Sequence, residues 1–297
     1  MIDGARAQGL LMGVAAALIG GGWQVATRQA TTAAVAPADL AVLRYGIPAL
    51  LLLPVMLRCG LLPRTVPRRL LALIVCGAGL PFGLVAMVGT QFAPTTHMGV
   101  LMAGASPLIA AALAFVLWRD RPGGTRSIGL LLMLLGVLLL AGKSLSNWSG
   151  ASWKGDALFL LAATLWAGFT LSFRRTGLTP WQAAALVNTW SALGMLVWVL
   201  VHGGSGLLAM PMPELAWHAL WQGLLAGVLG LWTYSVAIAR LGAAPAAAFG
   251  ALAPVVSAVG GWLLLGDPLT WLDGVAVMAA AGGVLLASGA MGAKELR

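Results

Sequence analysis

Charged residues are too scarce in this chain to cover the surface of a soluble domain. Asp, Glu, Lys and Arg make up 8% of its 297 residues, against roughly 25% in an ordinary soluble domain. Hydrophobic residues reach 60%, and the mean hydropathy is +0.95. Lipid is the solvent that suits such a composition, so the lipid bilayer is the first partner to expect.

The apolar residues fall into ten runs, each close to the ~20 residues that one helical crossing of a bilayer needs. We therefore predict an all-α integral membrane protein with ten transmembrane helices. Their expected positions are 8–27, 38–58, 69–89, 95–118, 125–143, 153–173, 181–201, 214–239, 244–265 and 270–291. The first run continues into Trp23 and Arg28 without a clean cleavage site, which favours a retained helix over a signal peptide.

Lys and Arg cluster between the apolar runs and not along one polar face. The net charge of +9 therefore indicates membrane topology and not a nucleic-acid partner. With a cytoplasmic N-terminus, thirteen basic residues fall on the cytoplasmic side and three, Arg28, Lys143 and Lys154, on the other. Both termini are expected in the cytoplasm, with the chain in a bacterial-type inner (plasma) membrane.

The two halves of the chain repeat the same landmarks. Trp23 precedes Pro37 by fourteen residues, as Trp166 precedes Pro180. Three further pairs are offset by 147 residues: Pro107 with Pro254, Asp120 with Asp267, and Gly136 with Gly283. Each half holds five helices, an odd number, so the second half must be inverted relative to the first. We expect two repeats, residues 1–147 and 148–297, forming one structural unit with alternating access to a central cavity.

Two five-helix repeats, each with a Pro in its fourth helix and an acidic residue at that helix's end, resemble the EamA-type drug/metabolite transporter (DMT) superfamily. Within it the chain looks like the YddG-type amino-acid exporters. Trp166 matches a Trp of their sixth helix, whereas Ser106 stands where they carry a cavity Trp. The resemblance implies an exporter of small metabolites, amino acids first among them. A monomer is expected in preference to an obligate oligomer. An exchanger of phosphorylated or nucleotide-linked metabolites and a broad-specificity drug exporter are the alternatives.

Arg44 is the one basic residue well inside a predicted span. A charge there costs roughly 2.5–3.5 kcal/mol on insertion scales, so it usually faces a cavity or a partner. Its planar guanidinium suits a substrate carboxylate. The alternatives are snorkelling to the interface or an ion pair with Asp39.

Aromatic and polar residues within the spans are further candidates for substrate binding. Trp23 and Trp166 occupy equivalent positions in the two repeats and could line the cavity, unless they belong to the interfacial aromatic belt. His97 could line the exit route or exchange a proton, or only cap its helix. Weaker candidates are Gln24, Tyr45, Met102, Ser106, Thr170, Asn188, Trp232 and Tyr234.

Pro107 and Pro254 should kink the fourth and ninth helices, either as hinges or as static packing kinks. All eight acidic residues fall in loops, tails or helix ends. Proton coupling through a buried acid is therefore disfavoured. The sequence also shows no membrane-buried His/Asp pair, Ser/Lys dyad or metal-ligand cluster, so no enzyme, cofactor or metal site is expected.

Overall fold

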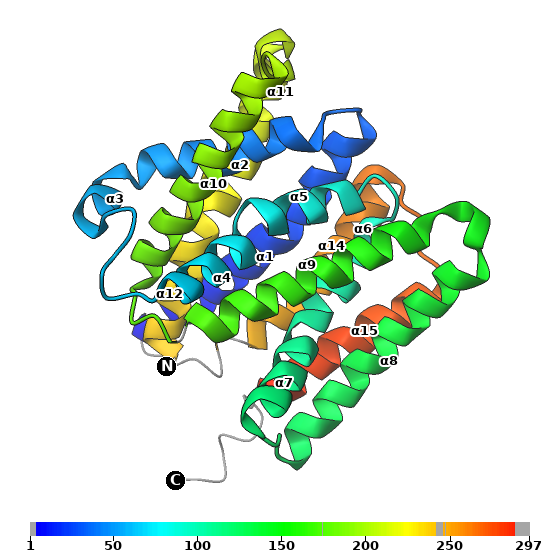
Figure 1. Ribbon diagram of the computed structural model, residues 1–297. Helices are drawn as coiled ribbons and strands as arrows, with labels where there is room; N and C mark the ends of the chain where they lie inside the picture. Colours follow the sequence, from blue (N-terminus) through cyan, green and yellow to red (C-terminus); the bar gives the residue numbers. More distant parts are fainter. Residues whose placement is uncertain (1–3, 174, 242–245, 247, 289–297) are drawn as a thin grey trace.

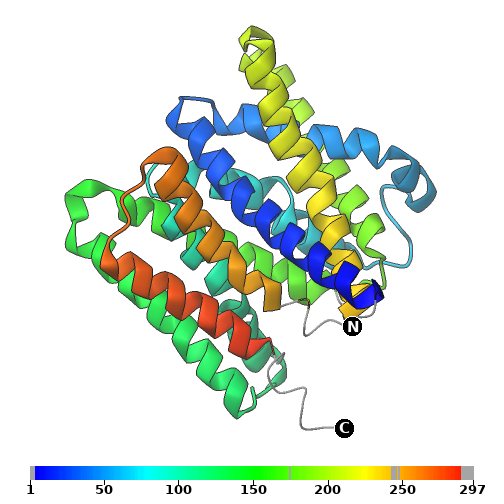
Figure 2. The same cartoon turned by 180° about the vertical axis from the view of Figure 1, so that it is seen from behind.

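Helices make up the regular structure of the chain. The computed structural model describes residues 4–173, 175–241, 246 and 248–288, and in these it has helices and loops but no strand. The helices pack side by side in one bundle (Figures 1 and 2). The predicted all-α class is confirmed.

Seven helices in the described residues are long and apolar enough to cross a membrane. Four of them are continuous α-helices: α1 (Gly4–Thr32), α8 (Gly124–Ser146), α9 (Ser152–Phe173) and α10 (Pro180–His202). Three are interrupted. They are α4 (Arg68–Ala78) with α5 (Leu80–Gly89), α6 (Thr95–Met98) with η1 (Gly99–Gly104) and α7 (Ala105–Trp118), and α11 (Met212–His218) with η4 (Ala219–Leu229) and α12 (Gly230–Leu241). These seven overlap seven of the predicted spans.

The second predicted span, 38–58, is wrong as a single helix. It is a pair, α2 (Pro37–Leu51) and α3 (Leu53–Cys59), bent by 68°. Pro54 explains the bend, because it has no N–H to continue the hydrogen-bond ladder of α2 and is well tolerated in the first turn of α3.

The last two predicted spans appear as shorter apolar helices. One runs over Phe249–Leu265 as η5 (Phe249–Ala251), α14 (Leu252–Gly260) and η6 (Gly261–Leu265), and the other is α15 (Trp271–Ala287). Residues 244, 245, 247 and 289–291 of these predicted spans lie outside the described residues. The count of ten spans depends on these two helices and on the bent pair α2–α3.

Side chains from two other helices satisfy the backbone where α4 breaks into α5. The Tyr45 hydroxyl, from α2, donates to the carbonyl oxygen of Gly79 at 2.6 Å. The Leu80 N–H donates to the Ser191 hydroxyl of α10 at 2.9 Å. Hydrogen bonds from α2 and α10 therefore stabilise the break. Without Ser191 the Leu80 N–H would lose this partner, which would be costly away from water.

We expect Tyr45→Phe to destabilise the protein by about 0.5–1.5 kcal/mol, because it removes one of the two hydrogen bonds that the buried Gly79 carbonyl accepts, the other being donated by the Gly83 N–H. Thermal unfolding in detergent measures the effect. Tyr234→Phe is the matched control, because no hydrogen bond of the Tyr234 hydroxyl is found in the described residues. An equal loss in both variants would contradict the assigned role of Tyr45.

Helices from the two halves pack in corresponding pairs. The first helix of the chain, α1, packs against α12 and α14, and the first long helix of the second half, α9, packs against α4, α5 and α7. The fifth pair, α8 and α15, lies side by side in both views (Figures 1 and 2). There a Cβ at Gly129 would lie 2.6 Å from the Gly283 carbonyl oxygen, so glycine permits direct backbone contact.

The fourth and ninth predicted helices end alike. Arg119 after α7 and Gly266 after η6 both adopt left-handed backbone, with φ of 57° and 68°. Asp120 and Asp267 follow them directly. Because α6 begins beside Asp267 and α7 ends before Asp120, these two acids mark opposite ends of the bundle, which we call the Asp267 end and the Asp120 end.

Pro107 and Pro254 each lie in the first turn of an α-helical segment. Pro107 follows the π-helical turn η1, and Pro254 follows the 3-10 turn η5. A helix's first turn tolerates a residue without an N–H, and the irregular turn before it absorbs the change in geometry. The fourth and ninth helices are thus interrupted at equivalent places.

Candidate functional site

Arg44 lies inside the bundle with its guanidinium against aromatic rings. Its Cζ is 5.3 Å from the centroid of the Trp23 ring and 5.9 Å from that of Tyr45. In the part of the chain that the structure describes, Arg44 makes no ion pair, and its Nε is buried without a hydrogen-bond partner. The alternative pairing with Asp39 does not form, because Asp39 accepts hydrogen bonds from Ser205 and Gly206.

The indole of Trp23 is held in place by a residue that sequence reasoning missed. Its Nε1–H donates to Oε1 of Gln222 at 2.7 Å, and Nε2 of Gln222 donates to the Thr27 hydroxyl at 3.0 Å. Gln222 is fully buried in the π-helix η4. The available signal was a glutamine within an apolar run, which in a membrane usually has a specific hydrogen-bond partner.

A glycine leaves room for Arg44 where α2 crosses η4. A Cβ on Gly227 would lie 2.3 Å from Cγ of Pro48 and 3.5 Å from Nη1 of Arg44. Only glycine fits this crossing without displacing Pro48. The first and second halves of the chain therefore both contribute to the surroundings of the guanidinium.

Trp23 and Trp166 are not in equivalent environments, although the repeat pairs them. Trp23 is 6% exposed and Trp166 is 38% exposed. Both rings contact Phe82 of α5, at centroid distances of 6.4 Å and 5.1 Å. The centroid of the Phe169 ring, also on α9, lies 5.2 Å from that of Trp166. Phe82, which sequence reasoning also missed, thus links the buried Arg44–Trp23 pair to a half-exposed aromatic surface on α9.

The remaining predicted candidates divide into two groups. Tyr45 and Met102 belong to the same buried core as Trp23 and Phe82, and Gln24 is buried with its Oε1 unpartnered. The others bond within their own helix or lie exposed: Ser106 to Met102 O, Thr170 to Trp166 O, Asn188 to Ala184 O, and Trp232 and Tyr234 on α12. Among the described residues, no hydrogen bond or ring contact joins Asn188, Trp232 or Tyr234 to Arg44.

His97 does not line an open route but is buried in hydrogen-bond contact with Asp156. Nδ1 of His97 and Oδ1 of Asp156 are 2.7 Å apart, and both residues are 4% exposed. The sequence-based conclusion that no buried His/Asp pair exists is therefore wrong. The residues are 59 positions apart, and they meet because α6 packs on α9, where a Cβ on Gly155 would lie 2.5 Å from Cβ of Ala93.

A second polar network lies at the Asp267 end. Asp267 Oδ2 accepts hydrogen bonds from the N–H and hydroxyl of Thr95 at 2.9 Å each, and its Oδ1 lies 3.6 Å from Nε of Arg28. Arg28 also donates to the carbonyl of Thr90. This network ties α1 and α6 to the end of η6. Asp120, its counterpart in the repeat, is exposed and has no ion pair in the described residues.

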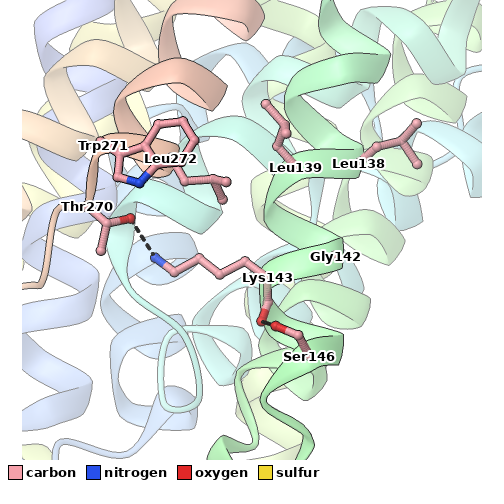
Figure 3. Close-up of a pocket in the computed structure, with 8 residues that line it drawn as sticks. All are labelled: Leu138, Leu139, Gly142, Lys143, Ser146, Thr270, Trp271 and Leu272. Carbon is pink, nitrogen blue, oxygen red and sulfur yellow. Dashed lines mark hydrogen bonds between the residues drawn. The ribbon is translucent and has the colours of Figure 1, made fainter.

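An open groove of about 580 Å³ runs between α8 and α15 at the Asp267 end (Figure 3). Lys143 reaches across it toward Thr270 and contacts both carboxylate oxygens of Asp273 at 2.6 Å. None of the predicted candidates lines this groove. The described residues also contain no group of three His, Cys, Asp or Glu side chains that could hold a metal.

The chain matches a known family once in each half. The model of the EamA-like transporter family matches residues 7–142 and again residues 153–289. A solved structure, described only as a crystal structure of a protein, matches 98% of this chain and all of its own chain, with a TM-score of 0.63 and 19% identity. That likeness concerns the fold alone.

Three curated relatives are similar in sequence. The uncharacterized protein PA1977 of Pseudomonas aeruginosa is 31% identical over 193 residues, 63% of each chain. The uncharacterized transporters YyaM and YcxC of Bacillus subtilis are 24% identical over 261 residues and 23% over 192. The alignment covers 85% of both chains for YyaM, and 62% of this chain and 61% of the relative for YcxC. The chain thus spans less than two thirds of the length of PA1977 and YcxC.

Proposed function

The chain belongs to the EamA-like transporter family, and from that premise we propose that it exports small carboxylate-bearing metabolites, amino acids first among them, across the bacterial inner membrane. The observation that carries the proposal is Arg44. A half-buried guanidinium that lacks a carboxylate partner and has its Nε buried without an acceptor is costly within a membrane span, so an incoming anionic group is the natural counter-ion. The Trp23 ring fixes its position, and the surface formed by Phe82 and Trp166 offers an apolar contact for the rest of the substrate.

We propose alternating access between two inverted repeats, residues 1–147 and 148–297, with ten spans and both termini in the cytoplasm. The two family matches, one in each half, support this arrangement. So do the corresponding packing of α1 and α9 and the matching left-handed caps at Arg119 and Gly266. In this conformation the Asp267 network is formed and Asp120 is free of ion pairs in the described residues, as expected if the two ends close in turn.

An exchanger of phosphorylated or nucleotide-linked metabolites is less well supported. Such substrates carry two or more negative charges and would need several free cations in the core. Arg28 is paired with Asp267, and Lys143 with Asp273. Among the described helices, Arg44 is the one unpaired cation that lies more than three residues from a helix end, and one guanidinium matches one carboxylate.

Transport by the full-length chain reconstituted in liposomes tests the proposal. We expect accelerated counterflow of at least one labelled amino acid over protein-free liposomes, and no counterflow of sugar phosphates or nucleotide sugars. Lipophilic cations complete the panel, because a broad-specificity exporter would move them. Transport of sugar phosphates or cations in preference to every amino acid would refute the proposed substrate class.

A further inference from the structure

The buried pair His97–Asp156 has no function in the site described above. It joins the beginning of α6 to the beginning of α9, at the Asp267 end of the bundle. Its 2.7 Å contact is as short as a charge-assisted hydrogen bond. The other carboxylate oxygen, Oδ2 of Asp156, is buried and has no hydrogen-bond donor. The carboxylate therefore depends on His97 for its compensation.

Charge balance makes this pair a site for one exchangeable proton. With the proton present, an imidazolium faces a carboxylate and the pair is neutral. Without the proton, the imidazole is neutral and the Asp156 carboxylate keeps its negative charge in a buried position, which is strongly unfavourable. Binding of the proton is therefore favoured while α6 and α9 remain packed. Once water reaches the pair, water can solvate the carboxylate and the proton is no longer needed.

Neighbouring cations do not compensate the charge of the Asp156 carboxylate in place of the proton. On the elements packed against α6 and the start of α9, the segments η1, α5, α7 and α14 carry no titratable side chain. Arg28 of α1 is committed to Asp267 and the Thr90 carbonyl, and Lys154 lies over the rings of Phe92 and Trp153. The remaining groups on these elements are Arg6 of α1, Arg68, Arg69 and Cys76 of α4, Arg126 of α8, and Lys143 of α8 paired with Asp273 of α15.

We propose that His97–Asp156 is a proton-binding site whose occupancy holds the Asp267 end closed, and that opening this end releases the proton. The closed state binds one more proton than the open state. By linkage, low pH favours closure and rising pH favours opening. This inference does not depend on the identity of the transported substrate.

Distances between spin labels test the proposal without any substrate. Labels on Ser149→Cys and Leu269→Cys, both exposed near the Asp267 end, report the separation of the α8–α9 connection from the η6–α15 connection. The background carries Cys59→Ser and Cys76→Ser, and the full chain is studied in lipid nanodiscs. Between about pH 5 and about pH 8, the range in which histidine changes charge, we expect the open-to-closed ratio to rise by about fivefold or more.

Two variants should shift this ratio in opposite directions. His97→Gln keeps the charged Asp156 and removes its proton, so the long distance should predominate at both pH values. Asp156→Asn leaves the pair neutral, so the short distance should predominate at both. His202→Gln, a histidine stacked on Trp198 at the end of α10, is the matched control and should respond to pH as the parent does.

The proposal is overturned if the parent shows no pH response. It is equally overturned if His97→Gln and Asp156→Asn respond to pH as the parent does, or if His202→Gln abolishes the response. Misfolding of either variant does not rescue it, because the parent titration needs no substitution at the site. Failure of the liposome panel with a normal pH response would instead refute the proposed substrate class alone.

Discussion

Arg44→Gln is expected to weaken transport of carboxylate-bearing substrates by about 10- to 100-fold, mainly through a raised KM. Hydrogen bonds to charged groups contribute about 1.5–3 kcal/mol, and this substitution removes the charged donor while keeping a polar side chain. Counterflow of an amino acid and of its uncharged amide measures the effect. Transport of the amide should fall little, because the uncharged amide gains little binding energy from the guanidinium.

The same substitution should leave stability unchanged or improve it. Arg44 is a half-buried cation without an ion pair in the described residues, and replacing such an uncompensated charge by a neutral group removes a cost of folding. Thermal unfolding in detergent therefore separates a binding role from a structural one. A lower unfolding temperature together with equal loss for acid and amide would show that Arg44 is structural.

Arg175→Gln provides the matched control for Arg44→Gln. Arg175 also stacks on an aromatic ring, with its Cζ 3.9 Å from the centroid of Trp118, but it is exposed at the Asp120 end. Its substitution should leave the ratio of acid to amide transport unchanged. Arg44→Lys should recover part of the loss, since it restores the charge without the planar fork.

The sequence predicts the membrane class and the family well, because both depend on composition and residue spacing, which can be seen without knowledge of tertiary contacts. Apolar runs and their lengths identify spans wherever each helix must satisfy its own backbone in lipid. The bend between α2 and α3 is the exception. Its cause, Pro54, is visible in the sequence, but a proline near the end of a run is also common in straight spans, so the 68° angle needed the structure.

The candidate site was predictable only where one residue is unusual by itself. Arg44 is conspicuous as a charge within a span. Its neighbours Gln222 and Phe82 are ordinary residue types, and only the crossing of η4 and α5 with α1 and α2 brings them to Trp23. Tertiary contacts also explain the missed His97–Asp156 pair, since Asp156 opens a helix in sequence yet is buried by α6.

Residues at equivalent positions of the two repeats do not have the same side-chain environments. Trp23 and Trp166 are equivalent in sequence, but one is buried under Arg44 and the other is half-exposed beside Phe82. Under the proposed inverted-repeat mechanism, a transporter closed at one end has equivalent residues in different environments, because its two repeats then occupy different conformations. The difference between Asp267 and Asp120 has the same explanation under the proposed mechanism.

Asp267→Asn should open the Asp267 end, whereas Asp120→Asn should not. Asp267 accepts two hydrogen bonds from Thr95 and pairs with Arg28, and loss of its charge weakens all three contacts. If the free-energy difference between the closed and open states falls by about 1.5–3 kcal/mol, the value of a hydrogen bond to a charged group, the ratio of open to closed protein rises about 10- to 100-fold. Asp120 has no ion pair in this conformation among the described residues, so its neutralisation removes nothing from the closed Asp267 end.

A buried cysteine behind the Asp267 network measures this opening. Met102→Cys, in the Cys59→Ser and Cys76→Ser background, places a thiol at a position that is 5% exposed, about two turns along the fourth predicted span from Thr95. A membrane-impermeant thiol reagent added from the Asp267 side should modify it at least about tenfold faster with Asp267→Asn. Equal acceleration by Asp120→Asn would contradict alternate closure, because the two acids would then act on the same end of the bundle.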